Sequence, residues 1–191
     1  MDYNFQEALH KYFGFDKFRF GQEEIIKSLV ERNDTIVVIP TGGGKSLCYQ
    51  LPAILLDGTA IVISPLIALM KDQVDALHKR NYPASFINSS LPYYEVQQRL
   101  NAAIRGEYKL LYITPERLES SRFLEMLKGI NLSFLAVDEA HCISEWGHDF
   151  RPSYLKIMPS FEVLPRIPII ALTATATPEV QEDIMRRRAH A

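Results

Sequence analysis

The sequence has few cysteines, no excess of charge of either sign and no long apolar run. Among its 191 residues only Cys48 and Cys142 are cysteines, and they do not form a C-x-x-C pair. These residues therefore contain neither a multi-cysteine zinc module nor a disulfide framework. The formal net charge of −2 provides no overall basic surface of the kind that usually accompanies nucleic-acid binding. Any contact with DNA has to come from local patches.

Membrane and secretion signals are also missing. No apolar run approaches the roughly 18 residues that a membrane span requires. The segment Met1 to Phe5 lacks the basic and apolar parts of a secretory signal. We therefore expect a soluble intracellular protein, cytoplasmic or in the nucleoid, with no membrane partner. Internal repeats, low-complexity tracts and linker-like segments are absent as well, which favours one domain.

Short β-branched runs alternate with amphipathic stretches of helical spacing, and this alternation predicts the fold class. It is typical of an α/β domain with a mostly parallel, twisted sheet and helices on both faces. The clearest helical stretches are Leu66–Arg80, Tyr93–Arg105 and Glu116–Leu127. The runs expected to form strands are Thr35–Ile39, Thr59–Ile63, Ala84–Ile87, Lys109–Ile113, Phe134–Val137 and Pro168–Leu172.

Prolines and hydroxyl residues mark where helices should begin and end. A capping hydroxyl precedes a proline at Ser64-Pro65, Thr114-Pro115 and Thr177-Pro178, which predicts three helix starts. Pro52 lies inside Leu47–Leu56, so we expect that helix to end or kink there. The segment Met185–Ala191 shows no pattern of a packed element and is interpreted as a cut end or expression remnant.

Three glycines, a lysine and a serine follow the first expected strand, in the order Pro40-Thr41-Gly42-Gly43-Gly44-Lys45-Ser46. Glycines allow backbone N–H groups to approach phosphate oxygens, and a following helix N-terminus adds positive potential. Lys45 is expected to reach the β- and γ-phosphates of ATP, and the Ser46 hydroxyl to ligate Mg²⁺. The general pattern G-x-x-x-x-G-K-[ST] has Ile39 at its first glycine, which points away from kinases and small GTPases. The alternative is a glycine-rich turn with a solvated lysine.

Two carboxylates, Asp138 and Glu139, end the apolar strand Phe134–Val137. In open α/β sheets, ligands bind at this edge. We expect Asp138 to hold Mg²⁺, mostly through water, and Glu139 to polarise the attacking water. The alternative is a polar strand end that starts a helix, where acids are favoured anyway. Together with the phosphate loop, the acidic pair predicts an ATPase.

The segment Asp138-Glu139-Ala140-His141 resembles superfamily 2 helicases, and its continuation to Tyr154 resembles the aromatic-rich loop of RecQ-type DNA helicases. The resemblance covers about residues 5–186. Further matching segments are Phe13–Gln22 (the adenine-recognition motif), Thr41–Gln50 (motif I), Ser64–Val74 (motif Ia), Tyr112–Leu118 (motif Ib) and Leu172–Thr177 (motif III). The resemblance implies that residues 1–186 form a first RecA-like lobe with a P-loop, and that residues 187–191 lie outside this lobe.

The resemblance assigns roles to individual residues. Gln22 is expected to pair with the adenine edge, and Phe15 and Arg19 to offer flat surfaces for the base. Many relatives have Tyr at the position of Phe15 and often Pro at that of Phe20. The alternative for this segment is a core-packed helix hairpin, to which Phe5, Leu9, Phe13 and Phe18 are expected to contribute.

In the aromatic-rich loop, Trp146 and Phe150 are expected to stack on unpaired bases. Arg151 is expected to contact a phosphate or to relay the DNA signal to the ATP site. His141 is expected to link the acidic pair to Thr173 and Thr175 of motif III. The alternative for the two aromatic residues is core packing. Lys71 and Arg117 are further candidates for DNA contact.

For the complete protein, the resemblance implies ATP hydrolysis coupled to 3′-to-5′ unwinding of single-stranded and partially duplex DNA, in DNA repair and recombination. A second helicase lobe, which supplies an arginine finger, is not in this chain, so the fragment alone is expected to be poorly active. Two rival functions are a non-helicase P-loop ATPase or kinase and a non-catalytic nucleotide- or DNA-binding module.

Overall fold

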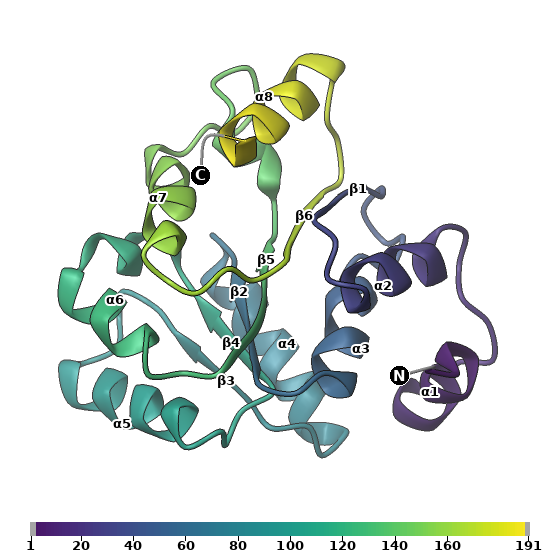
Figure 1. Cartoon of the computed structure of the whole chain (residues 1–191), viewed down its shortest axis with the longest axis horizontal. Helices are drawn as coiled ribbons and strands as arrows, with labels where there is room; N and C mark the ends of the chain where they lie inside the picture. The colour runs from purple at the N-terminus through teal and green to yellow at the C-terminus, as the bar shows by residue number, and fades with distance from the viewer. Residues whose placement is uncertain (1–2, 190–191) are drawn as a thin grey trace.

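Residues 3–189 form one twisted sheet of six strands, with helices packed on both faces (Figure 1). The structure is a computed structural model that describes these residues, with side chains described for residues 3–186. The strand order is β1-β6-β5-β2-β4-β3, and every pairing is parallel. The strands are β1 (Thr35–Val38), β2 (Thr59–Ile63), β3 (Ala84–Ile87), β4 (Leu110–Ile113), β5 (Leu132–Val137) and β6 (Ile169–Thr173).

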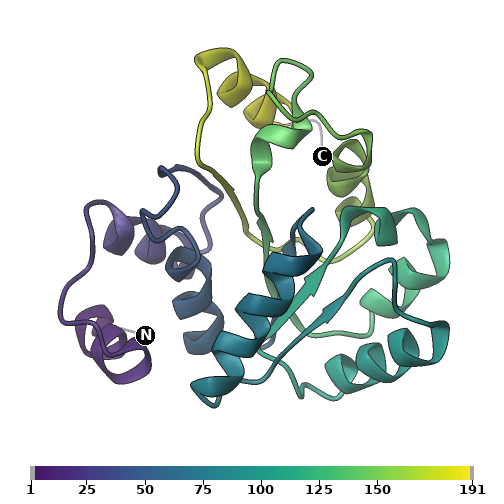
Figure 2. The same cartoon turned by 180° about the vertical axis from the view of Figure 1, so that it is seen from behind.

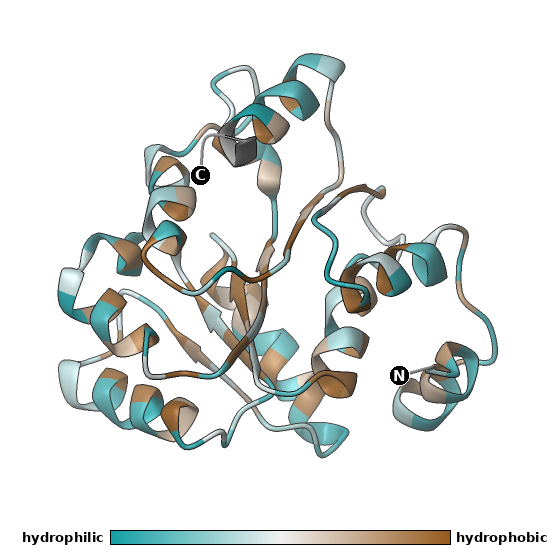
Figure 3. Cartoon of the chain, in the orientation of Figure 1, coloured by the Kyte–Doolittle hydropathy of each residue, from teal (hydrophilic) through white to brown (hydrophobic). Residues whose placement is uncertain are grey.

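Alternate residues along each strand enter two separate apolar cores. In β2, Ile61 and Ile63 belong to one buried cluster, and Ala60 and Val62 belong to the other. Figure 3 shows the same arrangement as apolar strands between helices whose outer surfaces are hydrophilic. The helices are α1 (Phe5–Phe13), α2 (Gln22–Val30), α3 (Leu47–Leu55), α4 (Ile67–Lys79), α5 (Tyr93–Ile104), α6 (Ser121–Leu127), α7 (Ile157–Glu162) and α8 (Pro178–Ala189), with short 3₁₀ turns η1 (Pro115–Glu119), η2 (Ala140–Ile143) and η3 (Pro152–Lys156).

The helices divide between the two faces by their order in the chain. Helices α2, α3 and α4 contribute to the core on one face, and α5 to α8 contribute to the core on the other. Helix α1 packs outside α2 and α3 through a third cluster that includes Leu9, Ile26 and Leu51. In Figure 2 this outer helix lies at the left, with the N-terminus, while α5 and α6 lie at the right. None of these helices combines the length and apolar character needed to cross a membrane.

A crevice is expected where neighbouring strands send the chain to opposite faces. Strand β1 continues into α3, which packs on one face, and the adjacent strand β6 continues into α8, which packs on the other. Because all strands are parallel, the segments after β1, β5 and β6 meet at the same carboxyl edge. Open α/β sheets bind ligands at such a point.

The predicted fold class and all six strands are confirmed, with boundaries that differ by one or two residues. The helix expected over Glu116–Leu127 is divided into η1 and α6. The division occurs because the Ser120 hydroxyl accepts a hydrogen bond from Phe123 N (3.3 Å) and starts a new helix. Of the two outcomes expected at Pro52, an end or a kink of the helix, the end is wrong. The helix continues to Leu55, and its buried neighbours Leu51 and Ala53 are held in the core.

The three expected capping hydroxyls behave differently. Thr177 accepts from Val180 N at 3.4 Å, as predicted. Ser64 instead accepts from Leu66 N, two residues on, and within residues 3–186 the buried Thr114 hydroxyl has no hydrogen-bond partner. The segment expected to lack an element, Met185–Ala191, begins within a helix, because α8 continues to Ala189. Residues 190–191 lie outside the described residues.

Candidate functional site

The loop Pro40–Ser46 joins β1 to α3 in a conformation that needs its glycines. Gly44 has φ +87°, in the left-handed region that favours glycine. A Cβ atom there would lie 2.5 Å from the Gln22 side-chain nitrogen, and a Cβ on Gly43 would lie 2.8 Å from the Pro40 carbonyl oxygen. The glycines therefore allow these groups to approach the loop closely, and they add no side chains that would cover the N–H groups needed for phosphate oxygens.

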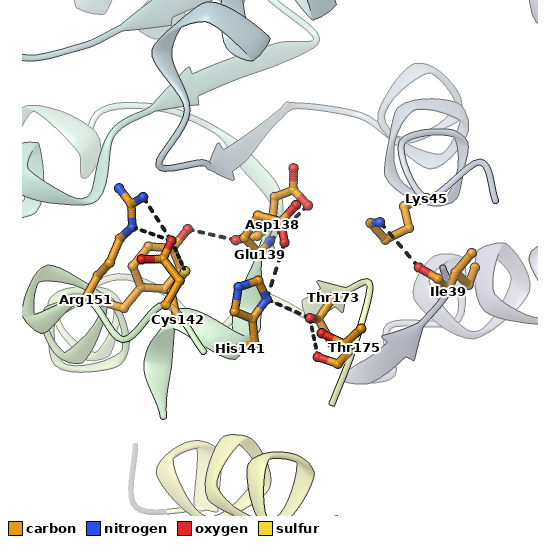
Figure 4. Close-up of polar contacts among 11 residues, drawn as sticks. Ile39, Lys45, Asp138, Glu139, His141, Cys142, Arg151, Thr173 and Thr175 are labelled. Atoms are coloured by element: carbon orange, nitrogen blue, oxygen red, sulfur yellow. Dashed lines mark hydrogen bonds and ion pairs between the residues drawn. The ribbon is translucent and has the colours of Figure 1, made fainter. Parts of the chain in front are cut away.

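Lys45 and Ser46 lie where this loop enters α3. The Lys45 ammonium donates to the Ile39 carbonyl oxygen at 3.3 Å (Figure 4). The Ser46 hydroxyl contacts the hydroxyl of buried Tyr49. Asp138 lies near enough to the same tyrosine to act on it electrostatically. Lys45 in turn acts electrostatically on Asp138. The lysine, the serine and the first carboxylate of the acidic pair therefore surround one region of the carboxyl edge.

Asp138 is a buried carboxylate at the end of β5. Burial, and secondarily the charge of Glu139, raises the pKa of Asp138 to about 6. The Glu139 N–H donates to Asp138 Oδ1 at 3.0 Å, and the buried Tyr154 hydroxyl donates to the Asp138 carbonyl oxygen at 2.8 Å. A carboxylate whose charge is so poorly compensated fits a divalent cation, which would favour the ionised form. Ser46 supplies a second oxygen of the kind that Mg²⁺ prefers.

Glu139 has an unusual backbone conformation for a residue with a side chain. Its φ of +50° lies in the left-handed region, where such residues are uncommon and strained. This turn sends the chain from β5 into η2, and it places Glu139 Oε2 3.3 Å from His141 Nδ1. The side chain is 23% exposed, so unlike Asp138 it retains access to solvent.

His141 connects the acidic pair to the end of β6, as Figure 4 shows. Its Nδ1 lies 2.9 Å from the Thr173 hydroxyl, which donates its proton to the Thr175 carbonyl oxygen at 2.9 Å. Because the Thr173 proton is already used, Thr173 must accept from Nδ1, which assigns the proton to Nδ1. Burial, and then the neighbouring His148, lower the pKa of His141, which favours the neutral imidazole.

The expected adenine-recognition residues contact the phosphate loop. The Gln22 side chain is buried, donates from Nε2 to the Gly44 carbonyl oxygen at 3.1 Å, and accepts from Arg19 N at 2.8 Å. The Arg19 guanidinium donates to the Gly42 carbonyl oxygen. Phe15 and Thr41 are exposed. The segment therefore joins the start of α2 to the phosphate loop through hydrogen bonds.

In the aromatic-rich loop, core packing does not explain Trp146, which is 79% exposed. Phe150 is half-buried. Arg151 forms an ion pair with Asp149 (3.0 Å), and its backbone N–H donates to the Cys142 carbonyl oxygen (3.0 Å). This last hydrogen bond closes the loop next to η2, so the exposed tryptophan is carried by a segment anchored near His141.

A second group of metal-ligand types, formed by His141, Cys142 and Asp149, has its ligand atoms within 4.8 Å of one another. Asp149 is already paired with Arg151. Burial raises the pKa of the Cys142 thiol to about 12, which keeps it protonated. The ion pair and the buried thiol account for this group.

The match to a protein-family model decides the family. The model for DEAD/DEAH box helicases covers residues 19–184, which include the phosphate loop, the acidic pair and the segment after β6. The chain belongs to the DEAD/DEAH box helicase family.

Among characterised members of this helicase family, the chain is similar to RecQ proteins. It is 56% identical to the ATP-dependent DNA helicase RecQ of Bacillus subtilis and 47% identical to that of Pasteurella multocida, over 95% and 94% of this chain. The matches cover only 31% and 28% of those relatives, so the chain spans about a third of their length. It corresponds to their N-terminal part.

Solved helicase structures share the fold. The Mycobacterium smegmatis helicase Lhr bound to ssDNA and AMP-PNP matches with a TM-score of 0.73 and 26% identity, over 94% of this chain and 26% of that one. The DUF1998 helicase MrfA bound to DNA also has a TM-score of 0.73, at 20% identity, over 97% of this chain and 28% of that one. The predicted RecA-like helicase fold is therefore confirmed.

Several contacts of this helicase lobe were not predicted from sequence. The Tyr154 hydroxyl supports the backbone of Asp138, and the His148 ring stacks on His141 with centroids 4.1 Å apart. Nothing in the sequence marks Tyr154, because a buried aromatic residue is ordinary in a core. The ion pair between Arg151 and Asp149 could have been expected from the sequence, since the two opposite charges lie only two residues apart.

Proposed function

We propose that this chain is the ATP-binding motor lobe of a RecQ-type, ATP-dependent DNA helicase. The observation that carries the proposal is the continuous set of contacts from Glu139 through His141 to Thr173. A simple nucleotide-binding module has no need for a buried histidine that joins its acidic pair to a neighbouring strand. A motor does need one, because hydrolysis must change the position of other segments.

Each residue of the ATP site has a role that its surroundings support. Lys45 and the N–H groups of Gly42 to Ser46 would hold the phosphates, and Gln22 with Arg19 and Phe15 would hold the adenine. Ser46 and Asp138 would hold Mg²⁺, which neutralises phosphate charge when bound. Glu139, more exposed than Asp138 and oriented by His141, would position and polarise the attacking water.

DNA is the proposed partner of the aromatic-rich loop. The relatives are named as DNA helicases, and two structures of similar fold contain DNA. Trp146 would stack on an unpaired base, with Phe150 and Arg151 beside it. Thr173 and Thr175 would receive the resulting movement through His141. In the complete protein we expect 3′-to-5′ unwinding of single-stranded and partially duplex DNA, for repair and recombination, in the cytoplasm or nucleoid.

A second lobe of the same protein is the other proposed partner, because the relatives continue well beyond the matched part. An arginine finger supplied by such a lobe contributes on the order of 10³–10⁵ in rate. This chain by itself is therefore expected to bind nucleotide weakly and to hydrolyse it slowly.

The test compares ATP hydrolysis by the full-length protein and by this chain, each with and without single-stranded DNA. We expect strong DNA stimulation for the full-length protein and only slow turnover for the chain. A full-length protein that hydrolyses ATP at the same rate without DNA would indicate a non-helicase ATPase. One that binds ATP without turnover would indicate a binding module, and either result rejects the proposal.

A further inference from the structure

The carboxyl edge of the sheet carries a row of segments that ends at strand β3. In the order of the sheet, Asp138 follows β5, Ser64 follows β2, Thr114 follows β4 and Asn88 follows β3. The row therefore runs from the acidic pair to the edge of the sheet. The chain then enters α5, which lies beside α6 in Figures 1 and 2.

Two tyrosines stand exposed where α5 begins. Tyr93 is 55% exposed and Tyr94 is 67% exposed, although the next turns of the same helix bury Val96 and Leu100 in the core. The Arg122 guanidinium, from the start of α6, lies 4.9 Å from the centre of the Tyr93 ring. Within residues 3–186, Arg122 forms no ion pair, so its positive charge is not compensated.

The loop that presents the two tyrosines is held firmly. Arg117, a candidate for DNA contact in the sequence, donates to the carbonyl oxygens of Asn88 (2.9 Å) and Leu91 (3.2 Å). The buried Asn88 side chain accepts from the backbone N–H and the hydroxyl of Ser90, at 3.0 and 2.8 Å. The aromatic rings are therefore exposed on a fixed support, which reduces the entropic cost of binding a ligand.

We propose that Tyr93 and Tyr94, with Arg122, form a nucleobase-stacking platform that binds single-stranded DNA beyond β3. This inference rests on the proposed DNA helicase function and extends its DNA contacts to the far end of the carboxyl edge. Exposed aromatic rings bind bases without regard to sequence, because every base has a flat π-face. An unpaired guanidinium beside them suits the phosphate of the same strand. A protein partner would bind the tyrosines without nucleobases, so the comparison of oligonucleotides with and without bases tests whether DNA is the ligand.

The experiment measures binding of fluorescently labelled oligo(dT) to the full-length protein by anisotropy. The variants are Tyr93→Ala/Tyr94→Ala, the ring-preserving Tyr93→Phe/Tyr94→Phe and, as a surface control, Val163→Ala at the end of α7. Loss of stacking weakens binding by about 5- to 150-fold per base. We expect at least about 10-fold weaker binding for the double alanine variant and little change for the other two. On an abasic oligonucleotide of the same length, the wild type and the double alanine variant should bind alike.

Direct contact is tested with wild-type protein and an oligonucleotide that carries 5-iododeoxyuridine. Photo-crosslinks are expected on the peptide that contains Tyr93 and Tyr94, and this result does not depend on the folding of a variant. Equal oligo(dT) binding by the wild type and the double alanine variant, or crosslinks confined to other peptides, would overturn the platform alone. A wild-type protein that neither binds DNA nor shows DNA-stimulated hydrolysis would instead overturn the proposed function.

Discussion

The imidazole of His141 donates from Nδ1 to the hydroxyl of Thr173 at 2.9 Å, which joins the segment after β5 to the end of β6. The same nitrogen lies 3.3 Å from Glu139, and the Thr173 hydroxyl donates a hydrogen bond to the Thr175 carbonyl oxygen. Because Glu139 and Thr173 both accept from the same N–H of His141, a change at the acid alters the hydrogen bond that holds the end of β6. The two central residues of this chain of contacts, His141 and Thr173, are buried, where such hydrogen bonds are costly to leave unmade.

Replacing Thr173 by valine keeps the shape of the side chain but removes the acceptor for His141. We expect ATP binding to change little and DNA-stimulated hydrolysis by the full-length protein to fall roughly 10-fold, the equivalent of one hydrogen bond. Stability should fall by about 1–3 kcal/mol, because Nδ1 loses its nearer acceptor and the Thr175 carbonyl oxygen loses its donor. Thr35→Val is the control, since its hydroxyl bonds to Ser28 outside this chain of contacts. Equal loss of hydrolysis in both variants would contradict the coupling role.

Replacing Glu139 by glutamine should separate ATP binding from turnover. The amide keeps the size of the side chain but cannot polarise water, a contribution of about 10²–10⁴ in rate. We expect nucleotide affinity near that of the wild type, measured with a fluorescent ATP analogue, and hydrolysis reduced at least about 100-fold. Glu145→Gln, an exposed acid in the neighbouring loop, provides the matched control. Unchanged turnover in the Glu139 variant would show that this acid is not the catalytic base.

Sequence patterns predicted the sheet because each strand is a short β-branched run, and the phosphate loop because its glycines and lysine are adjacent in the chain. The pattern failed where tertiary contacts decide. Pro52 does not end its helix, because the core holds its neighbours, and the hydrogen bond from Arg117 to the Asn88 carbonyl oxygen was not predicted. The contact of Tyr154 with the Asp138 backbone depends on the path of η3 through space, and spacing in the sequence does not predict such a path.

Replacing Gly44 by alanine should damage the phosphate loop for two reasons. Its φ of +87° is strained for any other residue, and the new Cβ would lie 2.5 Å from the Gln22 nitrogen. Gly106→Ala is the matched control, because Gly106 has φ +76° and nothing within 4 Å. We expect the Gly44 variant to unfold at lower urea, with about 1 kcal/mol more lost stability than the control, and to lose nucleotide binding. If Gln22→Ala in the same chain restored none of the lost stability, the clash would not be its cause.

Without metal or nucleotide, the stability of this chain should depend on pH through Asp138. Its pKa is 3.8 in the unfolded reference and about 6 when folded, so between these values the folded state binds more protons than the unfolded state. Stability therefore falls as pH rises through this window, by about 3 kcal/mol at most. Urea unfolding in EDTA, at about pH 4.5 and about pH 7.5, measures the difference. Asp138→Asn should remove this slope from the wild-type profile, and an identical profile in the variant would assign the slope to other groups.

The emission of Trp146 should report DNA binding directly, because it is the only tryptophan in the chain and is 79% exposed. A base that stacks on the indole ring displaces water and quenches its fluorescence, so oligo(dT) should lower the emission of this chain. Anisotropy of labelled DNA, measured in the same titration, establishes that binding has occurred. Arg151→Gln should keep the quenching but reduce the salt dependence of binding by about one phosphate contact, if Arg151 contacts the backbone. Saturated DNA binding with unchanged Trp146 emission would place the DNA elsewhere on the lobe. If the salt dependence of binding is the same in the Arg151→Gln variant as in the wild type, Arg151 does not contact a phosphate, and its remaining role is to link the loop to Cys142 and the ATP site.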